Sequence, residues 1–237
     1  MDIKIKNRFT NEIIIEGKYK SVKDCLEKNK NANLKNAYLS NAYLKNANLS
    51  NAYLKNANLS NSYLKNADLE NAYLKNADLE NADLENADFK NANLENADFK
   101  NANLSYANLE NADLENANLF RADLENANFK NANLFRADLE NANLSGADLS
   151  GANLSGADLE NIKNYSQVHE VAIEIIRGQK IETFTEKEWS IIAQISLHRL
   201  CWDSIKKRYG NLKSILHVFK ILSELGFPEY YEKFKKQ

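Results

Sequence analysis

A strict five-residue repeat constrains the fold of this chain more than any other feature of its sequence. Between Ala32 and Glu160, Leu or Phe recurs at every fifth position from 34 to 159, which makes 26 consecutive units. Ala stands two positions before each of them except at Ser62, and the residue before the Ala is nearly always Asn. A period of five fits neither the 3.6 residues of a helical turn nor the two of a strand. One large and one small residue per unit cannot close a core alone, so the units must stack on one another.

The repeated pattern A-[N/D/Y]-[L/F]-x-x resembles the pentapeptide-repeat family over all 26 units. The resemblance implies a mainly β fold, a right-handed, four-sided β-solenoid with four repeats per coil, in which Leu, Phe and Ala point inward. At the spacing of stacked strands, about 6.5 coils would form a shaft roughly 31 Å long. The Asn before each Ala suits the corners of such a coil, because Asn tolerates positive φ.

Residues 20 apart would lie above one another in such a solenoid and form ladders. Two of these ladders are pairs of tyrosines, Tyr43 with Tyr63 and Tyr53 with Tyr73. The outward rings either stabilise the shaft by stacking or form an aromatic recognition surface.

The segments around the repeat divide the chain into an N-terminal cap at 1–30, the solenoid at 31–160 and a C-terminal α-helical domain at 161–237. The tail is rich in Ile, Trp, Phe and Lys, and its apolar periodicity predicts a small bundle of helices over 167–177, 185–202, 211–225 and 227–234. This tail could cap its own shaft or pair with that of another chain, so a homodimer is left open.

The N-terminal cap is expected to cover the open end of the solenoid, which would otherwise expose unpaired backbone groups. Residues 3–9 and 12–16 predict two short strands, with Gly17 ending the second. Ser21 is expected to cap a helix that starts at Val22, with Cys25 as a buried structural thiol rather than a nucleophile.

The overall charge excludes some partners. The chain has 31 Lys and Arg against 33 Asp and Glu, a net charge of −2, which argues against direct binding of nucleic acid. No apolar run approaches the roughly 18 residues of a bilayer span, so we expect no membrane contact and a cytoplasmic location. The charge is segregated, however: residues 81–160 carry five basic and 15 acidic residues, a net of −10, while residues 1–80 and the tail are mildly basic.

The sequence offers little catalytic chemistry. His198 and Cys201 share a helix face in the predicted tail, with Asp203 close by, which could begin a metal site or a Cys/His pair. A structural zinc needs four ligands, and no further Cys or His spacing completes the set. Phosphate-binding glycine loops and nucleophile elbows are absent from the sequence. We therefore predict a non-enzymatic protein without a cofactor; an enzyme or metal protein that uses the tail is the alternative from another class.

One predicted face of the solenoid collects seven carboxylates against two basic residues, Lys100 and Arg121. They are Asp78, Glu80, Asp98, Asp138, Glu140, Asp158 and Glu160. The resemblance brings in DNA mimicry, because some pentapeptide-repeat proteins resemble B-DNA and bind DNA gyrase. Over the four acidic coils, about 19 Å long, duplex DNA would carry roughly 11 charges. Against mimicry, the acids surround all four faces, and the shaft lacks the inserted loop of gyrase-protecting relatives. Charges that keep a repetitive rod soluble are the simpler explanation.

A second candidate surface is formed by Phe120-Arg121 and Phe135-Arg136, where aromatic and basic residues replace the polar pair after the central Leu. The two pairs are separated by three repeats, which predicts adjoining faces one coil apart and a single exposed apolar patch beside two arginines. Phe and Arg together are typical of protein interfaces. Alternatively, the rings lie under the tail or flat along the rod. The sequence thus predicts a protein-interaction or scaffold module.

Overall fold

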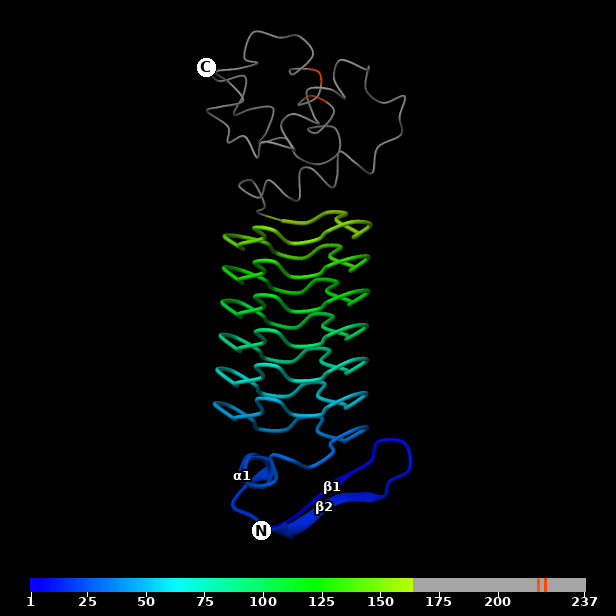
Figure 1. The fold of residues 1–237 in the computed structure, drawn as a ribbon, viewed down its shortest axis with the longest axis vertical. Coiled ribbons are helices and arrows are strands. Elements are labelled where there is room, and N and C mark those ends of the chain that lie inside the picture. The colour runs from blue at the N-terminus through cyan, green and yellow to red at the C-terminus, as the bar shows by residue number, and fades with distance from the viewer. Residues whose placement is uncertain (164–216, 218–219, 221–237) are drawn as a thin grey trace. The chain divides into compact units, whose positions relative to one another are not determined.

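The computed structural model describes residues 1–163, together with His217 and Lys220. Contacts divide the chain into two compact units, Met1–Tyr165 and Ser166–Gln237. The first unit consists of a small cap followed by a stack of coils (Figure 1). Among the described residues, no helix is long and apolar enough to cross a membrane.

The coils are joined by parallel bridges, each of which links a residue to the one 20 positions later. The first bridge in the shaft joins Asn33 to Tyr53, and the last joins Asn143 to Lys163. Backbone hydrogen bonds follow the same step: the N–H of Leu44 donates to the carbonyl of Tyr63 at 2.8 Å. This spacing confirms the β-solenoid with four five-residue sides per coil.

Each corner is a turn across the two residues that follow the central Leu or Phe. In one example, the N–H of Ala47 donates to the carbonyl of Leu44 at 2.9 Å and closes a turn whose third residue, Asn46, has a φ of 56°. A type II turn requires positive φ at this position, and Asn adopts it at less cost than other non-glycine residues. Asn accordingly fills 20 of the 26 corners between 36 and 161, and Gly fills three.

The interior of the shaft is lined by the central Leu or Phe and the preceding small residue. Every central residue from 34 to 159 is buried. Phe89 and Phe99 meet edge to face, with ring centroids 5.9 Å apart. Ser62, in the place of an Ala, is 1% exposed, and its hydroxyl donates to the carbonyl of Leu59, which satisfies this buried polar group. Burial of these apolar side chains favours stacking by about 25 cal/mol per Å².

The solenoid continues past the predicted end at Glu160, as far as Lys163. Asn161 has a φ of 54°, and Lys163 still pairs with Asn143. Ile162 takes the inward position of the Ala and is 6% exposed.

The cap begins with an antiparallel hairpin of β1 (Asp2–Lys6) and β2 (Ile13–Lys18). β2 continues through Gly17, which pairs with Ile3, so the prediction that Gly17 ends the second strand was wrong. The strand extends because its backbone still finds partners in β1, although its glycine carries no side chain to pack.

The helix α1 (Val22–Lys28) follows the hairpin and confirms the predicted N-cap. The hydroxyl of Ser21 accepts a hydrogen bond from the N–H of Asp24 at 3.1 Å. Cys25 and Leu26 are buried on the inner side of this helix. Burial raises the pKa of the Cys25 thiol, which keeps it protonated and unreactive near neutral pH, as expected of a structural thiol.

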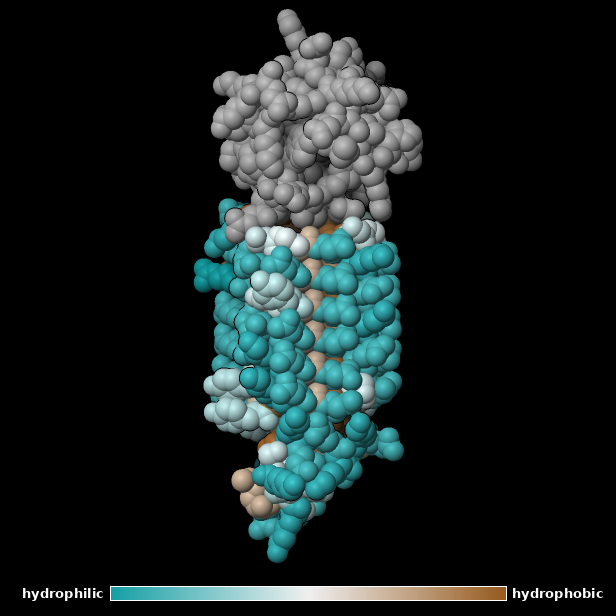
Figure 2. Space-filling view, turned by 90° about the vertical axis from the view of Figure 1, so that its left-hand side faces the viewer, coloured by the Kyte–Doolittle hydropathy of each residue, from teal (hydrophilic) through white to brown (hydrophobic). Residues whose placement is uncertain are grey.

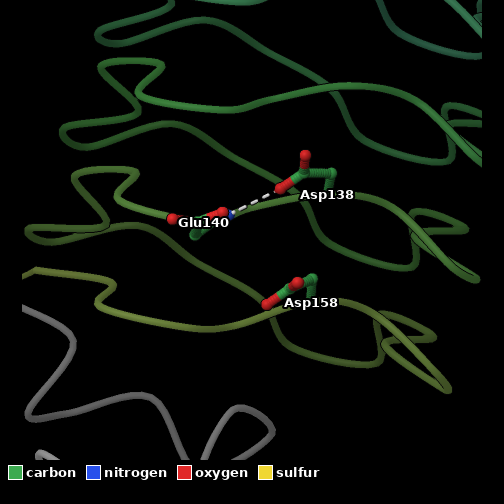
Figure 3. A group of neighbouring side chains, drawn as sticks. All are labelled: Asp138, Glu140 and Asp158. Atoms are coloured by element: carbon green, nitrogen blue, oxygen red, sulfur yellow. Dashed lines mark hydrogen bonds between the residues drawn. The ribbon is translucent and has the colours of Figure 1, made fainter.

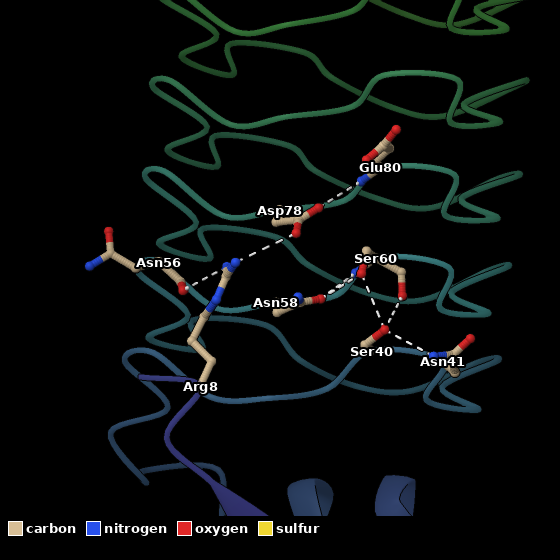
Figure 4. A network of polar contacts seen from close by, with 8 residues as sticks. All are labelled: Arg8, Ser40, Asn41, Asn56, Asn58, Ser60, Asp78 and Glu80. Atoms are coloured by element: carbon tan, nitrogen blue, oxygen red, sulfur yellow. Dashed lines mark hydrogen bonds and ion pairs between the residues drawn. The ribbon is translucent and has the colours of Figure 1, made fainter. Parts of the chain in front are cut away.

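The cap is fastened to the shaft by backbone bonds and by one long side chain. The N–H of Tyr38 donates to the carbonyl of Lys6 at 2.7 Å. Arg8 reaches further along the shaft, where its guanidinium donates to the carbonyl of Asn56 at 3.4 Å and lies 3.7 Å from a carboxylate oxygen of Asp78 (Figure 4). Arg8 therefore ties the cap to the third coil of the shaft, far along the chain.

Candidate interaction surfaces

The outer surface of the shaft is mainly polar, and most of it is occupied by regular side-chain ladders. Figure 2 shows one side as hydrophilic columns separated by a narrow apolar stripe. Corner asparagines continue the stack: the amide of Asn76 donates to Asn56 at 3.0 Å, and the amide of Asn96 donates to Asn76 at 3.2 Å. Serines do the same near the cap, where Ser40 donates to the carbonyl of Ser60 at 3.1 Å (Figure 4).

The two predicted tyrosine ladders are confirmed. The rings of Tyr43 and Tyr63 stack with centroids 4.7 Å apart, and those of Tyr53 and Tyr73 stack at 5.1 Å. Stacking covers one face of each ring, and the rings stay partly open to solvent, with Tyr43 74% and Tyr63 45% exposed. An aromatic recognition surface stays a prediction.

The Phe120-Arg121 and Phe135-Arg136 pairs occupy the two central positions of their turns. Arg121 and Arg136 have φ of 57° and 55°, so each adopts the left-handed conformation that Asn takes at ordinary corners. In each pair, the guanidinium lies over the neighbouring ring, 4.8 Å from its centroid. Both rings are half-buried rather than exposed. Within residues 1–163 the two rings do not stack on each other, and a single patch formed by both pairs stays a prediction.

Tyr106 is a third irregular corner, which the sequence analysis missed. It has a φ of 61° and is 53% exposed. The signal was present in the sequence, since Tyr106 stands where Asn normally precedes the Ala. Positions 106, 121 and 136 follow one another at intervals of three repeats, or three of the four sides of a coil. They therefore lie on three successive corners and form an oblique track that rises about 3.6 Å at each step.

These irregular corners interrupt the asparagine ladders. The ladder that starts at Asn61 continues through Asn81 to Asn101 and ends directly below Arg121. Arg also lacks the short amide that stabilises positive φ in Asn, so the substitution imposes backbone strain. The solenoid fold does not require these residues, and it would be more regular without them.

The predicted acidic face is divided by basic partners. Near the cap, Asp78 pairs with Arg8, and Lys100 lies 3.7 Å from Glu80. At the other end, carboxylate oxygens of Asp138, Glu140 and Asp158 lie within 4.8 Å of one another (Figure 3). The ladders place all seven carboxylates on one face, with the four aspartates in one column and the three glutamates in the next. Carboxylate oxygens are ligands for Ca²⁺ or Mg²⁺, but these are surface groups, and acidic clusters of this kind do not by themselves define a metal site.

An open depression of about 570 Å³ lies beside Arg121. It is lined by Arg121, Ala122, Asp123, Asn141, Asn143 and Lys163. It opens widely to solvent, so it offers no closed environment in which paired groups could be tuned for catalysis. The predicted tail site at His198, Cys201 and Asp203 lies outside the described residues. Of the predicted tail helices, only His217 and Lys220 in the segment 211–225 are described, and both are helical.

Comparisons with known proteins agree with the repeat. A family model described as a pentapeptide repeat region matches residues 32–109, and a second, described as pentapeptide repeats in eight copies, matches residues 97–134 and 132–163. No curated protein matches the chain.

Among solved structures, the pentapeptide repeat protein Rfr23 from the cyanobacterium Cyanothece 51142 is 44% identical over 38% of this chain and 62% of its own, with a TM-score of 0.37. A pentapeptide repeat protein from the Arabidopsis thaliana thylakoid lumen is 33% identical over 36% and 63%, with a TM-score of 0.32. QnrB1, a plasmid-mediated fluoroquinolone resistance protein, is 19% identical over 46% and 66%, with a TM-score of 0.34. This chain therefore spans less than two thirds of the length of each of these proteins.

Proposed function

The chain belongs to the pentapeptide-repeat family, and on that premise we propose that it is a non-enzymatic protein-interaction module. Its partner-binding surface is centred on Phe120-Arg121 and Phe135-Arg136, with Tyr106 as a third contact. The observation that carries the proposal is that all three corners depart from Asn or Gly at positive φ.

Backbone strain supports a role other than folding for these residues. Each left-handed residue other than Gly or Asn costs on the order of 1 kcal/mol. Positions that break a local rule of their fold without a structural gain are expected to be functional. At Arg121 and Arg136, that cost is offset only in part by the cation–π contact with the adjacent ring.

The charges around Arg121 and Arg136 also support a role in partner binding. Residues 81–160 carry a net charge of −10, yet neither arginine forms an ion pair within residues 1–163. Each guanidinium lies over a phenyl ring, a contact that uses none of its N–H donors. A held guanidinium beside an aromatic ring is the composition of interface hot spots.

The experiment replaces both pairs by the residues usual at these positions, with Phe120→Ser, Arg121→Asn, Phe135→Ser and Arg136→Asn in one chain. We expect the melting temperature to rise, because strain is relieved and two corner amides return. Binding should be followed by replacing Phe120 with the photo-crosslinking residue benzoylphenylalanine in cells of the source organism. A matched probe replaces Lys90, which lies on another column.

The expected result is a discrete, saturable adduct from position 120 that is absent from position 90 and is lost when Arg121→Asn and Arg136→Asn are added. A fourfold variant that melts well below the parent would contradict the proposal, because the pairs would then serve the shaft. Equal adducts from both probe positions would contradict it as well.

The second candidate function is inhibition of DNA gyrase by mimicry of DNA, favoured by the cluster of Asp138, Glu140 and Asp158. It is tested with purified gyrase in a supercoiling assay, comparing the parent with the variant Asp138→Asn, Glu140→Gln and Asp158→Asn. A control variant neutralises an equal number of carboxylates on another face, with Asp68→Asn, Glu70→Gln and Asp88→Asn. Mimicry requires inhibition by the parent and the control but not by the first variant; no inhibition at micromolar protein excludes it.

An enzyme or metal protein that uses His198 and Cys201 is the remaining alternative. Metal analysis of the purified full chain tests it, because a zinc site would retain bound metal.

A further inference from the structure

One corner column of the shaft has its charges separated into two unbroken blocks. It consists of Lys35, Lys55, Lys75, Glu95 and Glu115, which we call the block column. Backbone bonds place these residues above one another: Asn36 N donates to the carbonyl of Lys55, and Asn96 N donates to that of Glu115, both at 2.9 Å. The two blocks meet at an ion pair between Lys75 and Glu95, with an N–O distance of 2.5 Å. Lys35, Lys55 and Glu115 form no ion pair within residues 1–163. The column on the opposite side of the coil, with Lys45, Lys65, Glu85 and Glu125, is separated in the same way, but Ser105 interrupts its acidic block.

The adjacent corner column shows that the shaft does not need this arrangement. It consists of Glu70, Lys90, Glu110 and Lys130, so its charges alternate, and Lys90 lies 3.3 Å from Glu110. Like charges directly opposite one another on neighbouring strands are destabilising, whereas opposite charges are stabilising. The block column therefore costs stability within one chain, and alternation would remove that cost.

The mid-face column next to the block column carries groups that can bond across a second surface. Tyr53, Tyr73, Asn93 and Asp113 follow one another through parallel bridges. Tyr53 is 39% exposed and stacks on Tyr73. This column thus has hydroxyl donors in its first half and a carboxylate acceptor in its second half.

We propose that this face, made of the block column and the Tyr53 column, binds the same face of a second copy of the chain in antiparallel orientation. The two-fold axis lies in the interface and is perpendicular to the shaft, at the height midway between Lys75 and Glu95. It sets Lys55 against Glu115 of the second copy. The same axis sets Tyr53 against Asp113 and gathers both Lys75–Glu95 pairs at the centre. Two-fold symmetry makes each contact twice.

The repeat itself keeps this register over the whole face. Both shafts have the same coil spacing, so a match at one coil holds at the next. A single solenoid face is smaller than the roughly 800 Å² per partner of a standard interface. The contacts are mainly ion pairs at the surface, which salt screens. The pairing is therefore weak and salt-dependent, with a Kd on the order of 0.1 mM at low salt.

The dimer does not rest on the proposed function. Phe120 and Arg121 lie at a corner that does not border this face, so they stay open to another partner. Phe135 lies at the end of the block column, opposite Lys35 of the second copy. Failure of the dimer would leave the Phe120-Arg121 contact unaffected, and the reverse also holds.

Charge exchange tests the register. Sedimentation equilibrium of the full chain between about 10 and 500 µM, in 50 mM NaCl, should show reversible dimerisation that 500 mM NaCl abolishes. Lys55→Glu or Glu115→Lys alone should weaken dimerisation at least tenfold, since each places like charges opposite each other. The double variant should restore it. Both single variants introduce an opposite charge beside the remaining block within one chain, so loss of the dimer would not reflect a weakened fold.

Lys45→Glu is the matched control, because it makes the same charge change in the opposite column, where Ser105 interrupts the acidic block, and so distinguishes the two faces. It should leave dimerisation unchanged. Monomers at 500 µM and low salt would overturn the proposal. So would self-association that Lys55→Glu and Glu115→Lys leave unchanged, an equal loss with Lys45→Glu, or failure of the double variant to recover.

A carbodiimide crosslink reports the contact itself. Within one chain, Lys55 and Glu115 are three coils or about 14 Å apart, too far for a zero-length bond. A Lys55–Glu115 isopeptide formed between ¹⁴N- and ¹⁵N-labelled copies is the expected product in 50 mM NaCl. Its absence, alongside a detected intrachain Lys75–Glu95 product, would contradict the antiparallel register.

Discussion

The two halves of the shaft have the same interior and different surfaces. Up to Asn101, every corner carries Asn, the tyrosines stack, and corner amides form ladders. From Ala102 to Lys163, corners carry Tyr106, Arg121, Arg136 and three glycines as well. The backbone does not register this change, because the bridges from each coil to the next continue through both halves. The inward Leu, Phe and Ala therefore set the fold, and the outer positions are free to serve something else.

Core substitutions should test whether the interiors are equivalent, and they should have the largest effect. Leu74 and Leu134 are both fully buried, one in each half. Leu74→Ala and Leu134→Ala should each lower the free energy of unfolding by about 3 kcal/mol, because each removes apolar contacts and leaves a cavity. Urea denaturation followed by circular dichroism measures this. A cost at Leu134 less than half of that at Leu74 would mean that the irregular half has a looser core.

Substitutions at the corners should cost more stability in the first half of the shaft than in the second. Asn76 takes part in two ladder bonds, to Asn56 and from Asn96, whereas the side chain of Asn116 forms none within residues 1–163. Asn76→Arg should cost about 2 kcal/mol, from strain and lost bonds, and Asn116→Arg about 1 kcal/mol, from strain alone. The same urea measurement applies. Equal costs would show that the ladders add nothing to stability.

The glycine corners offer a related check on strain. Gly146 has a φ of 67°, and an added Cβ would lie 2.3 Å from the side-chain oxygen of Asn126. Gly146→Ala should therefore cost about 1 to 2 kcal/mol, more than an alanine substitution at an exposed asparagine corner such as Asn86. A Gly146→Ala variant as stable as the parent would show that this end of the shaft shifts to relieve the contact.

The repeat predicted most of the fold because each five-residue unit specifies both the inward side chains and the corner residue of one side of a coil. The period of five indicated stacked units, and the family resemblance carried by the repeat implied the four-sided coil and hence the tyrosine ladders. The positive φ of the corner asparagines followed from the tolerance of Asn for that conformation. Ser21 and Asp24 gave the helix start through local chemistry alone. The prediction failed where local signals and pairing disagree: Gly17 looks like a strand end but pairs with Ile3, and Ile162 breaks the sequence pattern while keeping the geometry.

The surfaces were less predictable, because they depend on side chains from distant repeats. The carboxylates of one face could be grouped from their spacing, but Arg8 of the cap neutralises Asp78 of a distant repeat, and no local pattern indicates that. The Phe-Arg pairs were found as departures from the repeat, but their rings turned toward their own arginines. Tyr106 departs from the repeat at one residue only, because Ser105 before it is an ordinary residue for that position, so its signal in the sequence is weaker.

The smallest expected effect on stability concerns a serine turn that occurs in both halves of the shaft. Ser60 donates to Asn58 in the first half, and Ser150 donates to Asp148 in the second, at 3.0 and 2.9 Å from their backbone N–H groups. The hydroxyl and the N–H of Ser150 lower the pKa of Asp148. A lowered pKa stabilises the fold above the ordinary carboxyl value near 3.9, and this contribution is lost as the pH falls through the folded value. NMR titration should therefore place the pKa of Asp148 below 3.9, and Ser150→Ala should raise that pKa. Asp148→Asn should keep the turn and remove the loss of stability that protonation of Asp148 causes at low pH. If Asp148 titrates at the ordinary carboxyl value in the parent, the hydrogen bonds from Ser150 do not stabilise its charged form, and this prediction fails.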